Sequence, residues 1–318
     1  MIKSNKIIYT YLALIVAMFF WGLSFIWSKI LLDFYNPITI VFLRLIISSI
    51  FLITIGLTFK KLQRINKNDI LNLLLLSFFQ PFLYFVGETF GLKYVSSTTA
   101  SVLIATIPLF APIAAYYFLK EKLSLLNFIG ILISIGGILL VLVKEDFKIS
   151  ASPIGMIFMF LAVTSAIAYS VLVVKTANKY NVYTIITFQN FIGIFLFLPF
   201  FLYFDLQHFM SVKLSFELVK PLIYLSVFAS SLAFMLFTYG IQVLGITKAN
   251  TIANIIPVFT AVFAYFLLDE KLSPLNIFGI AIVISGLFLS QLNKKLHLKN
   301  IIIPFRKEKP DKNESPNE

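Results

Sequence analysis

Glu88 and Arg44 are the charged residues of this chain that lie clearly within long apolar stretches, so they are the first candidates for chemistry. A charged side chain in hydrocarbon costs about 2–3 kcal/mol unless it is paired or faces water. Glu88 could therefore bind the cationic group of a small molecule or exchange a proton, and Arg44 could hold a carboxylate. The structural alternatives are an ion pair between the two, a Glu88 side chain that reaches the membrane surface, and an Arg44 that only locks helices together.

Other polar and aromatic side chains inside apolar stretches are candidates to line a cavity: Trp21, Gln80, Tyr84, Tyr169, Gln189, Asn250 and Asn254. Each of them could instead pack against a neighbouring helix or hydrogen-bond to it. Asn250 and Asn254 are spaced i and i+4, which puts both amides on one face of a helix.

The residues that surround these candidates predict an all-α polytopic membrane protein. Hydrophobic residues make up 59% of the chain and charged residues 13%, about half the charge expected of a soluble domain. Runs of about 20 apolar residues recur, each long enough to cross roughly 30 Å of hydrocarbon as a helix. We expect ten such spans, at about 8–28, 36–59, 70–92, 96–118, 124–143, 153–174, 182–204, 219–240, 246–268 and 274–292.

A fifty-residue segment of the chain is duplicated. Residues 91–140 align without a gap with residues 240–289, 149 positions on, and 21 of the 50 positions are identical. Composition alone would make roughly a tenth agree, so the match indicates a repeated unit. With five spans in each half, an odd number, the second unit (153–292) must cross the membrane upside down relative to the first (8–143). Residues 293–318 are polar and are expected to be disordered.

Pro108 and Pro257 occupy equivalent positions of the repeat, near the middle of the fourth and ninth spans. Each proline leaves the carbonyl four residues earlier, at Ile104 and Ala253, without its helical donor and bends the helix. In proteins with inverted membrane repeats, such interruptions tend to line a binding cavity. The glycines of the fifth and tenth spans predict close helix packing: Gly130, Gly136, Gly137, Gly279 and Gly286.

The net charge of +12 is explained by topology and not by nucleic-acid binding. With the N-terminus inside, 11 Lys and Arg residues fall on the inner side before the tail adds 7 more, against 7 on the outer side. This bias predicts that both termini lie in the cytoplasm and that the protein resides in the cell membrane, with the lipid bilayer as its partner.

The sequence predicts neither an enzyme nor a bound cofactor or metal. The chain has no cysteine and no His-Glu-x-x-His pattern, and its two histidines, His208 and His297, lie outside the apolar spans. Glu88 and Arg44 are too few charges for paired-carboxylate chemistry. No Walker-type loop is present, so ATP is not expected as the direct energy source.

The chain resembles the ten-helix EamA branch of the drug/metabolite transporter superfamily. The resemblance rests on Trp21-Gly22 with Lys29, on Pro37 with Arg44, and on a motif that both halves share: a mid-span proline followed by Glu-Lys-Leu-Ser, Asn, Gly and Gly (108/121/127/130/137 and 257/270/276/279/286). It covers about residues 8–292 and is not specific for any one substrate.

The resemblance implies a secondary transporter that works by alternating access on a small molecule such as an amino acid. Export is the favoured direction, and proton coupling and simple exchange are both open. Uptake of a metabolite or sugar by the same fold is the close alternative, and a non-transporting membrane scaffold or sensor is a further one. The protein could act as a monomer or as a homodimer.

Overall fold

The computed structural model describes residues 2–107, 109–110, 125–142, 152–177, 179–245, 249 and 252–291. Pro108, Asn250 and the tail 293–318 lie outside these described residues, so the predictions made for them stay predictions.

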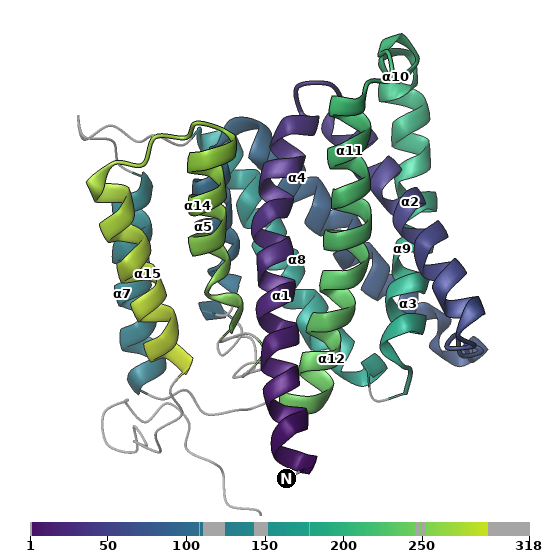
Figure 1. The fold of residues 1–318 in the computed structure, drawn as a ribbon, viewed down its shortest axis with the longest axis horizontal. Coiled ribbons are helices and arrows are strands. Elements are labelled where there is room, and N and C mark those ends of the chain that lie inside the picture. Colours follow the sequence, from purple (N-terminus) through teal and green to yellow (C-terminus); the bar gives the residue numbers. More distant parts are fainter. Residues whose placement is uncertain are drawn as a thin grey trace, which may run out of the picture.

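The described part of the chain is helical and contains no strand (Figure 1). Its elements are α1 (Ile2–Leu31), α2 (Pro37–Thr58), the 3₁₀ turn η1 (Lys67–Asp69), α3 (Ile70–Ser77), the π-helical segment η2 (Phe78–Leu83), α4 (Tyr84–Tyr94), α5 (Ser97–Ile104), α7 (Leu125–Leu142), α8 (Pro153–Ala177), α9 (Val182–Phe200), the π-helical segment η3 (Phe201–Asp205), α10 (Leu206–Ser211), α11 (Phe216–Tyr224), the π-helical segment η4 (Leu225–Ala233), α12 (Phe234–Leu244), α14 (Ile256–Leu267) and α15 (Pro274–Gln291).

The described helices fit a polytopic membrane protein. Seven of them, counting runs of consecutive elements as one helix, are long and apolar enough to cross a membrane, and two shorter apolar helices follow at Ile256–Leu267 and Pro274–Ser290. Every one of the ten predicted spans contains a described helix, although spans 96–118 and 246–268 are described only in part. Because hydrocarbon offers the backbone no hydrogen-bond partner, a lone span must satisfy its own N–H and C=O groups as a helix.

Helix starts are satisfied both by local caps and by distant side chains. Asn181 accepts a hydrogen bond from Thr184 N at 2.9 Å, where α9 begins. At the start of α2, Asp205 of η3 accepts from the backbone N of Thr39 at 3.0 Å and from its hydroxyl at 2.8 Å. A carboxylate from the second half of the chain therefore caps a helix of the first half.

The third and eighth spans are both interrupted by π-helical segments at equivalent positions. Segment η2 lies in the third span, and η4 lies 149 positions on in the eighth. Within η2, Gln80 has φ −146° and ψ 118°, which is extended backbone inside a helical run, and Pro81 follows it. This pairing extends beyond the fifty residues in which the sequence repeat is visible.

The fourth and ninth spans are broken at mirrored positions. Helix α5 ends at Ile104 and a turn follows at Ala105–Thr106, while the equivalent turn at Asn254–Ile255 precedes α14. The turn bonds match as well: Thr106 N donates to Leu103 O, and Ile255 N donates to Ile252 O, both at 3.1 Å. The bend predicted at Pro257 is thus a break in the helix. The break begins directly after Ala253, whose carbonyl group lacks its helical N–H donor because residue 257 is a proline.

Helices α7 and α15 pack against each other in antiparallel fashion, to one side of the bundle (Figure 1). Asn127 Nδ2 near the start of α7 donates to Ser290 O near the end of α15. Asn276 Nδ2 near the start of α15 donates to Val141 O near the end of α7 at 3.0 Å. The two donors are 149 positions apart, as are the two acceptors, so the same contact is made twice about a local two-fold axis.

Glycines allow the backbones of α7 and α15 to touch, as the sequence predicted. A Cβ atom on Gly130 would lie 2.5 Å from the carbonyl oxygen of Gly286, and one on Gly137 would lie 2.8 Å from that of Gly279. The prediction is wrong for Gly136 of the same helix, because no atom lies within 4 Å of such a Cβ there.

We expect Gly130→Ala to lower the free energy of unfolding by about 1–3 kcal/mol, because the added methyl group meets backbone atoms that cannot move aside. Gly136→Ala is the matched control and should be neutral or raise stability by up to about 1 kcal/mol, since alanine favours the helix. Thermal unfolding of the detergent-purified protein, followed by tryptophan fluorescence, measures both. Equal melting temperatures for the two variants would contradict the close contact.

Candidate functional site

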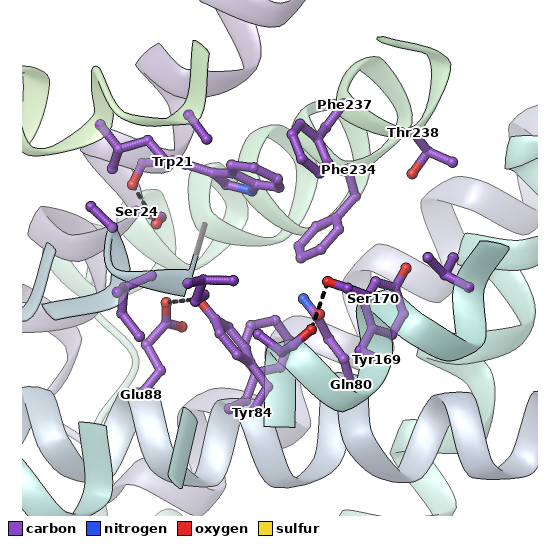
Figure 2. Close-up of a pocket in the computed structure, with 18 of the residues that line it drawn as sticks. Trp21, Ser24, Gln80, Tyr84, Glu88, Tyr169, Ser170, Phe234, Phe237 and Thr238 are labelled. Atoms are coloured by element: carbon purple, nitrogen blue, oxygen red, sulfur yellow. Dashed lines mark hydrogen bonds between the residues drawn. The ribbon is translucent and has the colours of Figure 1, made fainter. Parts of the chain in front are cut away.

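A pocket lies inside the bundle, between helices from both halves of the sequence (Figure 2). The first half contributes α1, α2, η2, α4 and α5, and the second contributes α8, α12 and the start of α14. The pocket holds about 1030 Å³ of space that no atom occupies, including its opening. Ile104 and Ala253, the residues at the two mirrored helix breaks, both line it.

The structure brings six of the nine predicted substrate or coupling residues to this pocket: Trp21, Arg44, Gln80, Tyr84, Glu88 and Tyr169. Gln189 lies behind the wall, where its Nε2 donates to Gln80 O at 2.8 Å, and its side chain is close to the Tyr169 hydroxyl. Asn254 is fully buried next to the ninth-span break and is not among the described lining residues.

Glu88 projects from α4 into the buried part of the pocket, with 9% of the residue exposed. The Tyr84 hydroxyl, one turn earlier on the helix, donates to Glu88 Oε1 at 2.9 Å. Arg44 Nη1 lies 3.9 Å from Glu88 Oε2, close enough for an ion pair and too far for a hydrogen bond. The interpretation in which Glu88 reaches the membrane surface is therefore wrong, and the carboxylate faces Arg44 within the protein.

Arg44 is held in place from several sides and is 2% exposed. Its Nε donates to Ser230 Oγ at 2.8 Å, and its guanidinium carbon lies 4.0 Å from the centre of the Phe85 ring. Arg44 Nη1 is buried and makes no hydrogen bond with the described residues. The guanidinium is thus positioned by η4 and α4. Its Nη1 group, beside the pocket, can still donate a hydrogen bond.

Aromatic rings form much of the remaining wall. The Trp21 ring lies 5.0 Å from that of Phe234 and 4.9 Å from that of Phe237, measured between centroids. Figure 2 shows these three rings across the pocket from Tyr84 and Glu88. Phe237 occupies the position 149 residues on from Glu88, so the two halves place different chemistry at equivalent points.

Within the described residues, no three His, Cys, Asp or Glu side chains are grouped so that they could hold a metal ion. The chemistry of the pocket therefore comes from one carboxylate, one guanidinium, several hydroxyl and amide groups, and aromatic faces.

Comparison with known proteins identifies the family of the chain. A family model described as the EamA-like transporter family matches residues 8–143 and 153–292. The chain belongs to this family. The resemblance deduced from the sequence motifs is thereby confirmed, and the chain is a multi-pass membrane protein of a transporter family.

Two relatives of this EamA-like protein are named as uncharacterized transporters. An uncharacterized transporter of Archaeoglobus fulgidus is 28% identical over 283 residues, which cover 88% of this chain and 96% of that protein. The uncharacterized transporter YetK of Bacillus subtilis is 25% identical over 289 residues, covering 90% and 87%. A solved crystal structure of a protein shares the fold with a TM-score of 0.67 at 15% identity, covering 89% of this chain and 98% of that one.

Behind the pocket of the EamA-like protein lies a buried polar network that sequence reasoning missed. Asn190 Nδ2 donates to Ser48 Oγ at 2.7 Å and to Ser230 O at 3.3 Å, and the Ser48 and Ser231 hydroxyls are 2.6 Å apart. Because Ser230 also binds Arg44, the network ties α2, α9 and η4 to the guanidinium. Ser48 and Ser231 each belong to a Ser-Ser pair in an apolar run. These pairs gave no signal, because the partners of Ser48 lie 142 and 183 positions away.

We expect Arg44→Met to lower the free energy of unfolding by about 3–5 kcal/mol, because it leaves the Glu88 carboxylate buried beside an uncharged neighbour. Glu88→Gln alone should cost less, and the double variant should be more stable than Arg44→Met. The double-mutant cycle, measured by thermal unfolding in detergent, should give a coupling of about 1 kcal/mol or more. Additive effects within about 0.5 kcal/mol would show that the pair does not interact.

Proposed function

We propose that this protein is a secondary transporter that moves a small metabolite such as an amino acid across the inner membrane, with export as its favoured direction. This proposal rests on the pocket between the two halves. Residues at both helix breaks line it, together with a buried carboxylate and a buried guanidinium. Membership of a transporter family supports the same class of function.

The proposed architecture is ten membrane-spanning helices in two inverted five-helix repeats, at residues 8–143 and 153–292, with both termini in the cytoplasm. Three observations support it: the antiparallel contact of α7 and α15, the paired π-helical segments η2 and η4, and the mirrored breaks before Pro257 and after Ile104. In such a carrier the two halves rock about a central site, which opens to one side of the membrane at a time.

The proposed solute carries charge as well as an apolar group. Arg44 has donor capacity for a carboxylate, and Glu88 can face an ammonium group, while Trp21, Phe234 and Phe237 supply an aromatic wall. Charged groups buried in a membrane protein are most stable when a partner neutralises them, so a solute with both charges fits the pair well.

Glu88 is the proposed site for coupling to protons, and direct exchange of solutes is the alternative. An alternating-access carrier runs in the direction that its gradients dictate, so uptake by the same pocket is the second candidate for direction. A scaffold or sensor without transport is the remaining alternative, and a flux measurement separates it from both.

The function is tested by comparing metabolites outside cells that express the wild type, Glu88→Gln or no transporter. We expect at least one small metabolite to accumulate outside only with the wild type, because the variant removes a charge that faces the pocket. Extracellular metabolites are quantified by mass spectrometry, and membrane extracts verify equal expression. If all three cultures match, export is wrong, and uptake is then measured in vesicles of the purified protein.

Coupling through Glu88 is tested in the same vesicles with the solute so identified. Glu88→Gln should abolish flux driven by an imposed pH difference and leave solute exchange at equal pH intact, since glutamine cannot exchange a proton. Glu217→Gln is the control, because Glu217 is an exposed acid in the first turn of α11. Equal loss of both kinds of flux in Glu88→Gln would refute the coupling role.

A further inference from the structure

The short connection between α4 and α5 accepts hydrogen bonds from one charged residue on one side and donates them to another on the other side. Lys29 Nζ, at the end of α1, donates to Leu92 O at 2.8 Å and to Val95 O at 2.9 Å. These carbonyls belong to the last turn of α4 and the residue after it, where the helix leaves acceptors unsatisfied and its dipole favours a cation.

The Glu270 carboxylate accepts hydrogen bonds from the other side of the same connection. Its Oε1 accepts from Ser97 N at 2.7 Å, and its Oε2 accepts from Thr98 N at 3.3 Å and from Thr98 Oγ1 at 2.9 Å. Glu270 follows α14, yet it caps the first turn of α5, where unpaired N–H groups favour an anion. Glu270, the glutamate of the repeated motif, thus joins the end of the ninth span to the start of the fourth.

Lys29 and Glu270 carry opposite charges, and each bonds to one side of the same connection. Together with the α4–α5 connection they form a cluster, which we call the latch: Lys29, Leu92, Val95, Ser97, Thr98 and Glu270. Its charge-assisted bonds hold the ends of α1, α4, α5 and α14 together on the membrane face opposite the start of α1, at the top of Figure 1.

The latch lies directly above the pocket. Ser24 and Glu88 line the pocket, and along their helices they are roughly 6–8 Å from Lys29 and Leu92 respectively. In the other direction the pocket reaches Val173 and Ile241, which are within about 6 Å of the last residues of α8 and α12, on the side where α1 begins. The latch therefore lies beyond the end of the pocket that faces away from the N-terminus.

We propose that Glu270 and Lys29 are the gate residues of that face: their bonds to the α4–α5 connection hold the pocket closed there and must break before it opens. This inference rests on the proposed alternating-access function. Bonds that form in just one of two states stabilise that state by the free energy of those bonds. Loss of the latch therefore favours the state that is open at that face.

The experiment uses the natural absence of cysteine from the chain. Ser24→Cys places one thiol in the pocket, and a charged methanethiosulfonate that does not cross membranes labels it from one face at a time. Right-side-out and inverted vesicles give the labelling rates from the two faces. This readout needs no solute. A result that refutes the latch can therefore be told apart from one that refutes the proposed transport function.

With Glu270→Ala added, we expect labelling from the latch face to rise on the order of tenfold and labelling from the opposite face to fall. Lys29→Met should shift the two rates in the same directions. Glu217→Ala is the matched control, since it removes an exposed carboxylate of α11 that is not part of the latch, and it should leave both rates unchanged.

A purely structural role would not move the two rates in opposite directions, because an unfolded carrier is labelled faster from both faces. If Glu270→Ala fails to accumulate in the membrane, Lys29→Met decides the question alone. An unchanged ratio of the two rates in the variants that do accumulate would overturn the proposal.

Discussion

The fold depends on one constraint: hydrocarbon provides no partner for a backbone N–H or C=O group. A helix that crosses it can be interrupted only where protein groups or water replace the lost hydrogen bonds. The interruptions at Gln80, after Ile104 and after Ala253 meet this condition, because all three positions border the central pocket. At these three positions, backbone groups that lipid could not satisfy lie beside the pocket, where a polar solute could use them.

The same constraint explains why the two halves hold together through repeated contacts. A lipid-exposed helix pair gains little from the hydrophobic effect, so α7 and α15 associate through glycine-mediated backbone contact and asparagine hydrogen bonds. Elsewhere, carboxylates reach across the repeat boundary: Asp205 caps α2, and Glu270 caps α5. Contacts at helix ends can be exchanged as helices tilt, whereas the glycine contact along α7 and α15 runs the length of both helices and suits a fixed pair.

The sequence predicted those parts of the structure that follow from local rules. Apolar length located the spans, and the missing N–H of Pro257 located the break after Ala253. Pro81 carried the same kind of information for η2, but it was overlooked because the third span was treated as continuous. The bond between Arg44 and Ser230 could not be predicted, since it joins residues 186 positions apart and depends on the π-helical geometry of η4. Six candidate residues reach the pocket because amphipathic side chains inside a membrane bundle have few other stable locations.

A symmetric scaffold carries an asymmetric site, and this difference has a physical consequence. If both halves were identical, the states open to either face would have equal energy by symmetry, and the pocket would bind a solute equally well in two orientations. Glu88 and its repeat equivalent Phe237 both line the pocket, so one side presents a carboxylate and the other a ring. A solute with a charged and an apolar end is then bound in one orientation. In the proposed alternating-access mechanism, its charged end would stay beside the half that contains Arg44 and Glu88, and the energies of the two states would no longer be required to be equal.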